Sequence, residues 1–254
     1  MIGKILASGQ LGKLASFVSP AFFDVMPAKA LWSRGRALVA GTRNHAAFRH
    51  AVAERSNELS ACLPQIELVA DRKSASTGPH AAMPPEQRAG IVTELYFHQL
   101  FHGKTALLDL RGASFTPAGE CLIWHPAAWQ GEWAPDFIAA LRDLYRGFYA
   151  KDDAMFQRGL RALSLEQSED LFRKHFGSDG FVAFRTVDFV DTFHQVFERC
   201  KQYGVALHPD FLPLGIYLAA LYDHLEDLAV AVDVAAAFER ATRNSNSRAE
   251  TLHA

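Results

Sequence analysis

Apolar residues recur at helical spacing through most of this 254-residue chain, and this periodicity constrains its fold more than any other feature. Phe137, Leu141, Leu144 and Phe148 form one such stripe, and the charged side chains between them fall on the opposite face. This pattern is typical of amphipathic helices that pack against a core, so we predict a mainly α protein. The predicted helices cover residues 2–18, 28–40, 44–63, 86–102, 135–149, 152–163, 165–176, 186–203, 209–228 and 232–241.

Two short apolar segments interrupt the helical pattern. Residues 105–110 (TALLDL) and 120–125 (ECLIWH) are too short for helices, and a turn-forming segment at 117–119 separates them. We predict two strands that form a small β-hairpin, and a further strand at 65–70 (QIELVA). The expected fold class is therefore mainly α with a small β-hairpin.

Loop-forming residues suggest where the chain divides. Residues 71–85 (DRKSASTGPHAAMPP) are rich in Ser, Pro and charge, which predicts a linker or long loop. Residues 244–254 predict a flexible tail. We therefore expect an N-terminal helical region at 1–70 and a helical domain at 86–243.

Composition excludes several classes of protein. The chain carries 26 basic and 28 acidic residues, so its net charge of -2 does not favour binding to nucleic acid. Cys62, Cys121 and Cys200 show no CxxC spacing, which favours a reducing, cytoplasmic location. The longest apolar stretch, at 211–238, carries four ionisable groups near its middle, so we expect no transmembrane segment.

His98 and His102 lie four residues apart on a predicted helix and share one face, so they could hold a metal together. The metalloprotease pattern would place a glutamate after the first histidine, where this chain has Gln99. The alternative is that both histidines flank the core without a ligand.

Asp223, His224 and Glu226 form a polar cluster in an otherwise apolar helix. With the two histidines His98 and His102 they could form a mixed nitrogen–oxygen metal site of a helical metal-dependent enzyme. The alternative is the solvated face of an amphipathic helix.

Asp109 ends an apolar strand and is followed by Arg111 and Gly112. A buried carboxylate needs a partner because an isolated buried charge costs several kcal/mol. Either Arg111 or a metal could supply that partner.

Trp124, Trp129 and Trp133 form an aromatic-rich segment. These side chains could line a ligand pocket or present a partner surface, which would make the chain a structural interaction module. The alternative is a small hydrophobic cluster beneath a long loop.

Several segments together resemble the UbiB/AarF family of atypical kinase-like proteins. Residues 8–11 (SGQL), with Pro20 ten positions after Gln10, resemble the family's lysine-x-glycine-glutamine motif, with Ala7 in the lysine position. The resemblance implies that Gln10 folds over a nucleotide site.

The later segments extend this resemblance to about residues 90–235. Residues 94–102 (ELYFHQLFH) resemble the helix before the family's catalytic loop. Residues 106–112 (ALLDLRG) resemble its metal-binding aspartate-phenylalanine-glycine segment, with Asp109 in the aspartate position. Segments of the C-terminal helices, 136–163 and 193–228, also resemble the family. The resemblance implies the C-lobe of a kinase-like fold, with Asp109 binding a nucleotide's magnesium.

The departures from the family concern catalysis. His102 is followed directly by residues 103–105 (GKT), so the family's catalytic aspartate and metal-binding asparagine have no counterpart. Phosphoryl transfer depends on such groups to position and neutralise the phosphates. The resemblance therefore implies a non-catalytic, pseudokinase-like protein. It would bind a protein partner or a small hydrophobic ligand in isoprenoid-quinone or lipid metabolism, with peripheral membrane contact.

Overall fold

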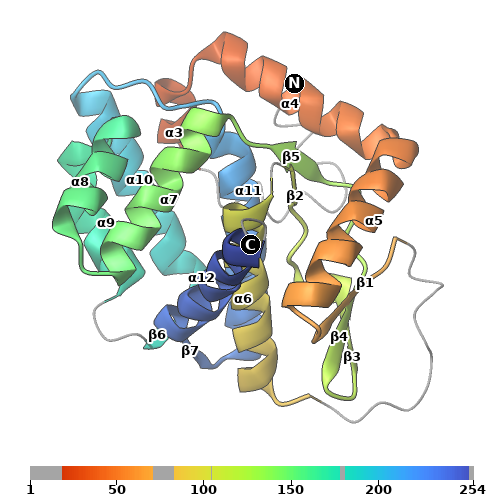
Figure 1. Ribbon diagram of the computed structural model, residues 1–254. Coiled ribbons are helices and arrows are strands. Elements are labelled where there is room, and N and C mark those ends of the chain that lie inside the picture. The colour runs from red at the N-terminus through yellow and green to blue at the C-terminus, as the bar shows by residue number, and fades with distance from the viewer. Residues whose placement is uncertain (1–18, 71–82, 104, 178–180, 252–254) are drawn as a thin grey trace. The chain divides into compact units, whose positions relative to one another are not determined.

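The computed structural model describes residues 19–70, 83–103, 105–177 and 181–251, and these residues are mainly helical (Figure 1). The chain forms two compact units, each built from segments that are distant in sequence. Residues of the predicted N-terminal region, 1–70, occur in both units. The first unit comprises Met1–Val39, Trp133–Asp179 and Arg185–Tyr222, and the second comprises Ala40–Glu132, Gly180–Phe184 and Asp223–Ala254.

The described residues of the first unit form helices and the loops that connect them, and none of these residues forms a strand. Phe22 of α3 and Phe197 of α10 pack edge to face, with ring centroids 5.3 Å apart. This contact joins two helices that lie far apart in sequence. The helices are α3 (Pro20–Val25), the first part of α4 (Ala28–Arg43), α7 (Pro135–Tyr149), α8 (Asp153–Ala162), α9 (Glu169–Phe176), α10 (Thr186–Gln202) and the first part of α11 (Phe211–Leu228).

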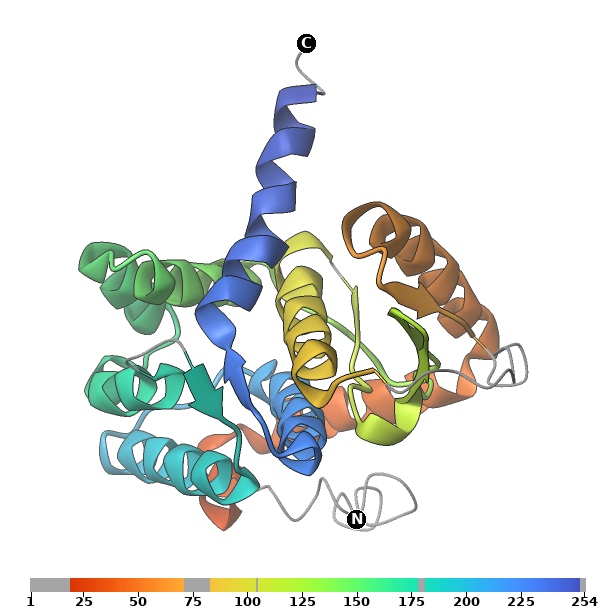
Figure 2. The ribbon, with the colours of Figure 1, turned by 90° about the horizontal axis from the view of Figure 1, so that it is seen from below.

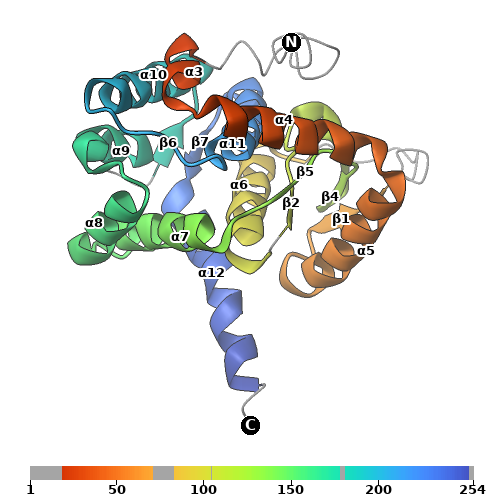
Figure 3. The same cartoon turned by 90° about the horizontal axis from the view of Figure 1, so that it is seen from above.

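Helices α7 and α8 of this unit lie against each other at close range (Figure 3). A Cβ atom on Gly147 would lie 2.2 Å from the backbone nitrogen of Phe156, and one on Gly159 would lie 2.6 Å from that of Leu144. Real Cβ atoms do not approach other atoms so closely. The two glycines are therefore what allows the two helix backbones to meet.

Capping side chains mark several helix starts in both units. Ser19 accepts a hydrogen bond from the backbone N–H of Ala21 at 3.2 Å, and Pro20 occupies the first position of α3. Asn44 caps α5 and Asp152 caps α8 in the same way. These caps satisfy N–H groups that have no partner inside the helix, so they define where each helix begins.

The second unit is built around the contact between α6 and α12. Phe238 of α12 packs edge to face against Phe97 and Phe101 of α6, with ring centroids 5.3 and 5.5 Å apart. Figure 2 shows the two helices side by side. The helices described in this unit are α5 (His45–Cys62), α6 (Pro85–His102), α12 (Val234–Thr251) and the ends of α4 and α11.

Small sheets complete the second unit. The first contains β1 (Ile66–Leu68), β4 (Cys121–Trp124) and β3 (Phe115–Ala118) in the order β1-β4-β3. Strand β4 runs parallel to β1 and antiparallel to β3. The other two are antiparallel pairs, in which β2 (Thr105–Leu107) pairs with β5 (Gln130–Glu132) and β6 (Phe181–Ala183) with β7 (Ala231–Asp233).

The predicted pairing of residues 105–110 with 120–125 is wrong. Strand β4 forms its hairpin with β3 instead, and β2 pairs with β5. The cause is local, because residues 115–118 form a strand themselves and Gly119 adopts a φ of +66° that closes a tight turn. The nearest extended segment therefore takes the antiparallel edge of β4.

The mainly helical prediction is confirmed for the described residues. The helix predicted at 135–149 coincides with α7, and the strand predicted at 65–70 contains β1. The predicted tail at 244–254 begins inside α12, and the helix predicted at 2–18 lies outside the described residues. Among the described helices, none is long and apolar enough to cross a membrane.

Candidate binding site and the Asp109 network

Asp109 follows strand β2, and its carboxylate is fully buried. Oδ1 accepts a hydrogen bond from Nε of Arg111 at 2.7 Å, and Oδ2 accepts one from Nη2 of the same residue at 3.0 Å. Oδ2 also accepts bonds from the Ser114 hydroxyl at 2.5 Å and from the backbone N–H of Ala127 at 2.8 Å. Both carboxylate oxygens therefore have protein donors, and Arg111 neutralises the charge.

The pKa of Asp109 follows from two opposed effects. Burial raises the pKa, but the hydrogen bonds from Arg111, Ser114 and Ala127 together outweigh burial and hold it below its usual value. The carboxylate is therefore ionised at neutral pH. Arg111 in turn lies over the Trp129 ring, with its guanidinium carbon 4.2 Å from the ring centroid.

A second buried group contacts the same turn from α11. Nδ1 of His224 lies 2.9 Å from the carbonyl oxygen of Leu110, so Nδ1 carries the proton in this contact. Nε2 of His224 is buried and has no hydrogen-bond partner among the described residues. Burial, with the nearby charge of Arg88, lowers the pKa of His224 to about 3. Arg88 of α6 donates to the carbonyl oxygen of Gly112 at 3.0 Å, so two helices hold this turn.

His98 and His102 do lie together at the end of α6, with ring centroids 4.5 Å apart. His98 is buried, and its Nδ1 has no hydrogen-bond partner among the described residues. Nε2 of His102 lies 2.9 Å from the carbonyl oxygen of Ala241. Burial, followed by the charges of His102 and Arg55, lowers the pKa of His98 to about 3. A nearby guanidinium also opposes a metal cation at this pair.

The structure does not assemble the mixed metal site that would combine His98 and His102 with Asp223, His224 and Glu226. His224 is engaged by the turn that follows Asp109. Within the described part of the chain, no three His, Cys, Asp or Glu side chains are grouped so that they could hold a metal ion.

The last predicted site residue, Gln10, lies outside the described residues. The proposed nucleotide contact of Gln10 and the magnesium contact of Asp109 rest on the family resemblance alone.

The three tryptophans are core residues. Trp124 is fully buried, and its Nε1 donates to the carbonyl oxygen of Asp109 at 2.9 Å. Trp129 is buried in the same unit, and Trp133 is buried in the first unit, where it packs against Phe137. This placement favours the hydrophobic-cluster interpretation over a tryptophan surface presented to a partner.

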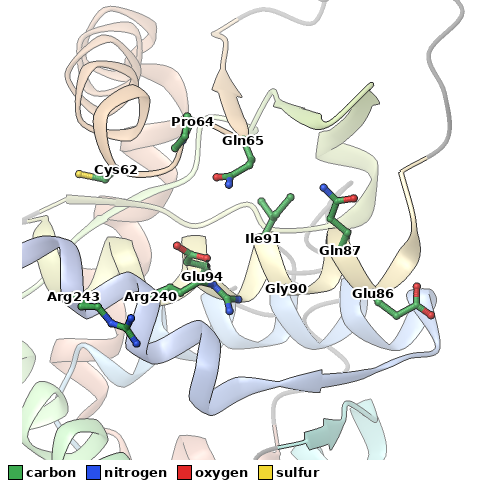
Figure 4. Close-up of a pocket in the computed structure, with 10 residues that line it drawn as sticks. All are labelled: Cys62, Pro64, Gln65, Glu86, Gln87, Gly90, Ile91, Glu94, Arg240 and Arg243. Carbon is green, nitrogen blue, oxygen red and sulfur yellow. Dashed lines mark hydrogen bonds and ion pairs between the residues drawn. The ribbon is translucent and has the colours of Figure 1, made fainter.

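A cleft of about 540 Å³ opens in the second unit between the end of α5, α6 and α12 (Figure 4). This volume falls in the range of small-molecule sites. Its lining is mostly polar and consists of Cys62, Pro64, Gln65, Glu86, Gln87, Gly90, Ile91, Glu94, Arg240 and Arg243.

Ion pairs organise the α12 side of this cleft. Nε of Arg240 lies 2.7 Å from Oε2 of Glu94, which joins α12 to α6. Nη2 of Arg243 lies 2.9 Å from Oε2 of Glu239, and both of these side chains are largely exposed. Gln87, Ile91 and Glu94 follow one another at spacings of four and three residues on α6, so they share one helix face.

The sequence interpretation missed this cleft. The sequence offers only a weak signal for the cleft, namely polar residues on one face of α6 and two arginines three residues apart in the last helix. The predicted end of that helix at residue 241 also left Arg243 outside it.

Comparison with known protein families and with curated proteins finds no match to this sequence.

Proposed function

We propose that this chain is a non-catalytic binding protein whose fold is related to the C-lobe of UbiB/AarF kinase-like proteins. The bidentate pairing of Asp109 with Arg111 carries this proposal. In metal-assisted phosphoryl transfer, the corresponding carboxylate must coordinate magnesium. Here it would first have to give up its pair with the partly buried guanidinium of Arg111, which then loses its counter-charge and faces the charge of the metal.

The connection between α6 and β2 supports the same proposal. Helix α6 ends at His102 and strand β2 begins at Thr105. A two-residue connection has no room for a catalytic aspartate and a metal-binding asparagine. The usual machinery of phosphoryl transfer is therefore absent from the place where the resemblance predicts it.

The cleft beside α6 and α12 supports a binding role. The resemblance implies a protein partner or a small hydrophobic ligand, in isoprenoid-quinone or lipid metabolism. The lining of this cleft favours a polar ligand at this position, because charged and amide side chains outnumber its apolar ones.

Thermal unfolding with and without magnesium and ATP tests the proposal. We expect no shift of Tm with Mg·ATP, and we expect Asp109→Asn to lower Tm equally in both conditions because it weakens the pair with Arg111. Asp170→Asn, which removes an exposed ion-pair partner of Arg199, is the control and should change Tm little.

A magnesium-dependent rise in Tm would contradict the proposal if Asp109→Asn abolished it. A ligand at a hundredfold excess over its Kd stabilises the folded state by about 2.7 kcal/mol, so such a rise would be easy to detect. Transfer of phosphate from Mg·ATP to any acceptor would also contradict it.

A further inference from the structure

The charges that line the cleft balance each other. Glu86 and Glu94 contribute two negative charges, and Arg240 and Arg243 contribute two positive charges. Figure 4 shows Glu86 at one end of the cleft and Arg243 toward the other. A multiply charged anion gains little from such a lining, whereas a ligand with opposite charges at its two ends is complementary to it.

The length of α6 sets the separation of the two charged ends. Glu86 and Glu94 lie eight residues apart on this helix, which corresponds to about 12 Å along its axis. Arg240 lies at the Glu94 end, because its guanidinium pairs with that carboxylate. An extended peptide rises about 3.3–3.6 Å per residue, so three or four residues span this distance.

The groups between the two ends suit a peptide backbone. Gln65 and Gln87 carry carboxamides that both donate and accept hydrogen bonds, as a peptide group does. Ile91 and Pro64 offer apolar surface beside them. At Gly90, the nearest atom to an added Cβ would be 3.8 Å away, on the Arg240 side chain. The Arg240 side chain therefore lies against α6 at this point and forms part of the wall of the cleft.

We infer that this cleft binds a peptide of three or four residues with free ends. Glu86 receives the ammonium group and Arg243 receives the carboxylate, while Arg240 keeps its pair with Glu94. Arg243 can turn toward the ligand because its pair with Glu239 is exposed, and exposed pairs contribute little free energy. The inference rests on the proposed binding function and names the class of ligand.

Isothermal titration calorimetry on the full chain tests this inference with four probes. They are a tripeptide of three leucines with free ends, its N-acetylated form, its C-terminally amidated form, and inorganic phosphate. We expect the free tripeptide to bind most tightly and each blocked form to bind roughly fivefold more weakly, because each loses one charge-assisted contact. Phosphate should bind more weakly than the free tripeptide.

Single substitutions assign the two ends. Arg243→Gln should weaken the free tripeptide roughly fivefold and leave the affinity of the amidated form unchanged. Glu86→Gln should also weaken the free tripeptide roughly fivefold, and it should leave the affinity of the N-acetylated form unchanged. The matched control is Arg185→Gln, an exposed arginine of the first unit that pairs with Asp188 within its own helix region and should change no affinity.

Equal binding of the free and blocked peptides would overturn the inference, as would tighter binding of phosphate or no binding of any peptide. Equal effects of Arg243→Gln and Arg185→Gln would overturn it as well. None of these outcomes contradicts the proposed non-catalytic function. Transfer of phosphate from Mg·ATP would contradict that function, but it would not contradict peptide binding in the cleft.

Discussion

Arg111 and Asp109 lie two residues apart, and the guanidinium faces the carboxylate through two hydrogen bonds, of 2.7 Å from Nε and 3.0 Å from Nη2. Bidentate pairs of this kind are among the strongest polar contacts in proteins. Because the carboxylate is fully buried, its stability depends on this partner. The turn after β2 is therefore stabilised by the local pair of Asp109 and Arg111. Arg88 of α6 and His224 of α11 contact the same turn.

Arg111→Met is expected to lower the free energy of unfolding by about 3–5 kcal/mol, because it leaves the Asp109 carboxylate buried without a counter-charge. Urea denaturation followed by circular dichroism measures this loss. Adding Asp109→Asn to Arg111→Met should recover part of it, since the uncompensated charge is then removed.

Arg158→Met provides the comparison for this pair. Arg158 also pairs with an aspartate, Asp143, but its side chain is 57% exposed. Its removal should leave the urea midpoint nearly unchanged. Equal losses for Arg111→Met and Arg158→Met would show that the Asp109 pair is no more than a surface contact.

The sequence predicted the helices well because their apolar stripes are long and regular. The stripe through Phe137, Leu141 and Phe148 specifies α7 without any tertiary information. The strands were harder, because each has only three or four residues and its pairing depends on segments elsewhere. Strand β5 (Gln130–Glu132) shows no alternation of apolar and polar residues that would reveal it.

In the candidate sites too, contacts between residues close in sequence could be predicted, and contacts between distant segments could not. Arg111 was named as a partner of Asp109 because the two are neighbours in sequence, and that contact is present. The contact of His224 with Leu110 joins residues 114 positions apart, so no local pattern predicts it. The cleft combines three distant segments, and only the fold brings Gln65, Glu94 and Arg240 together.

Stability should fall as the pH drops from about 6.5 toward 3. The pKa values of His98 and His224 are about 3 in the folded protein, against 6.5 for an unperturbed histidine. Between these values the unfolded chain binds protons that the folded chain does not, so acid favours unfolding. Each of these two histidines adds up to about 1.4 kcal/mol per pH unit to the slope of the free energy of unfolding against pH.

The lowered pKa of Asp109 acts at the acid end of the same range. Its contribution is present above the pKa of an unfolded aspartate, 3.8, and is lost as the pH falls through the folded value. Urea midpoints measured from pH 4 to 7 therefore report mainly the histidines. His224→Gln should reduce the slope, and His50→Gln, at a histidine whose side chain is 74% exposed, should not. An unchanged slope in His224→Gln would contradict this assignment.

Zinc should not stabilise the pair His98 and His102. Arg55 carries a positive charge near His98, and the described residues offer no third ligand. We expect Tm to be the same with and without one equivalent of Zn²⁺, and metal analysis of the purified protein to find no stoichiometric metal. A zinc-dependent rise in Tm that disappears in His98→Ala with His102→Ala would support a metal site instead.

Substitutions at Gly147 and Gly159 should disrupt the packing of α7 on α8. An added Cβ at Gly147 would meet the backbone of Phe156, and one at Gly159 would meet the backbone of Leu144. Backbone atoms cannot move aside as a flexible side chain can, so the two helices would have to separate. We expect Gly147→Ala and Gly159→Ala each to lower the free energy of unfolding by about 1–3 kcal/mol or more, measured by urea denaturation.

Gly35→Ala is the matched control for this effect. Gly35 also lies inside a helix, α4, but an added Cβ there would meet nothing within 4 Å. Alanine should therefore stabilise the chain by about 0.5–1 kcal/mol, because glycine loses more backbone freedom on folding. Opposite signs for Gly35→Ala and Gly159→Ala would locate the cost in the contact between helices, since helix propensity favours alanine at both positions. A stabilising effect at Gly159 would instead show that α7 and α8 do not approach each other this closely in solution.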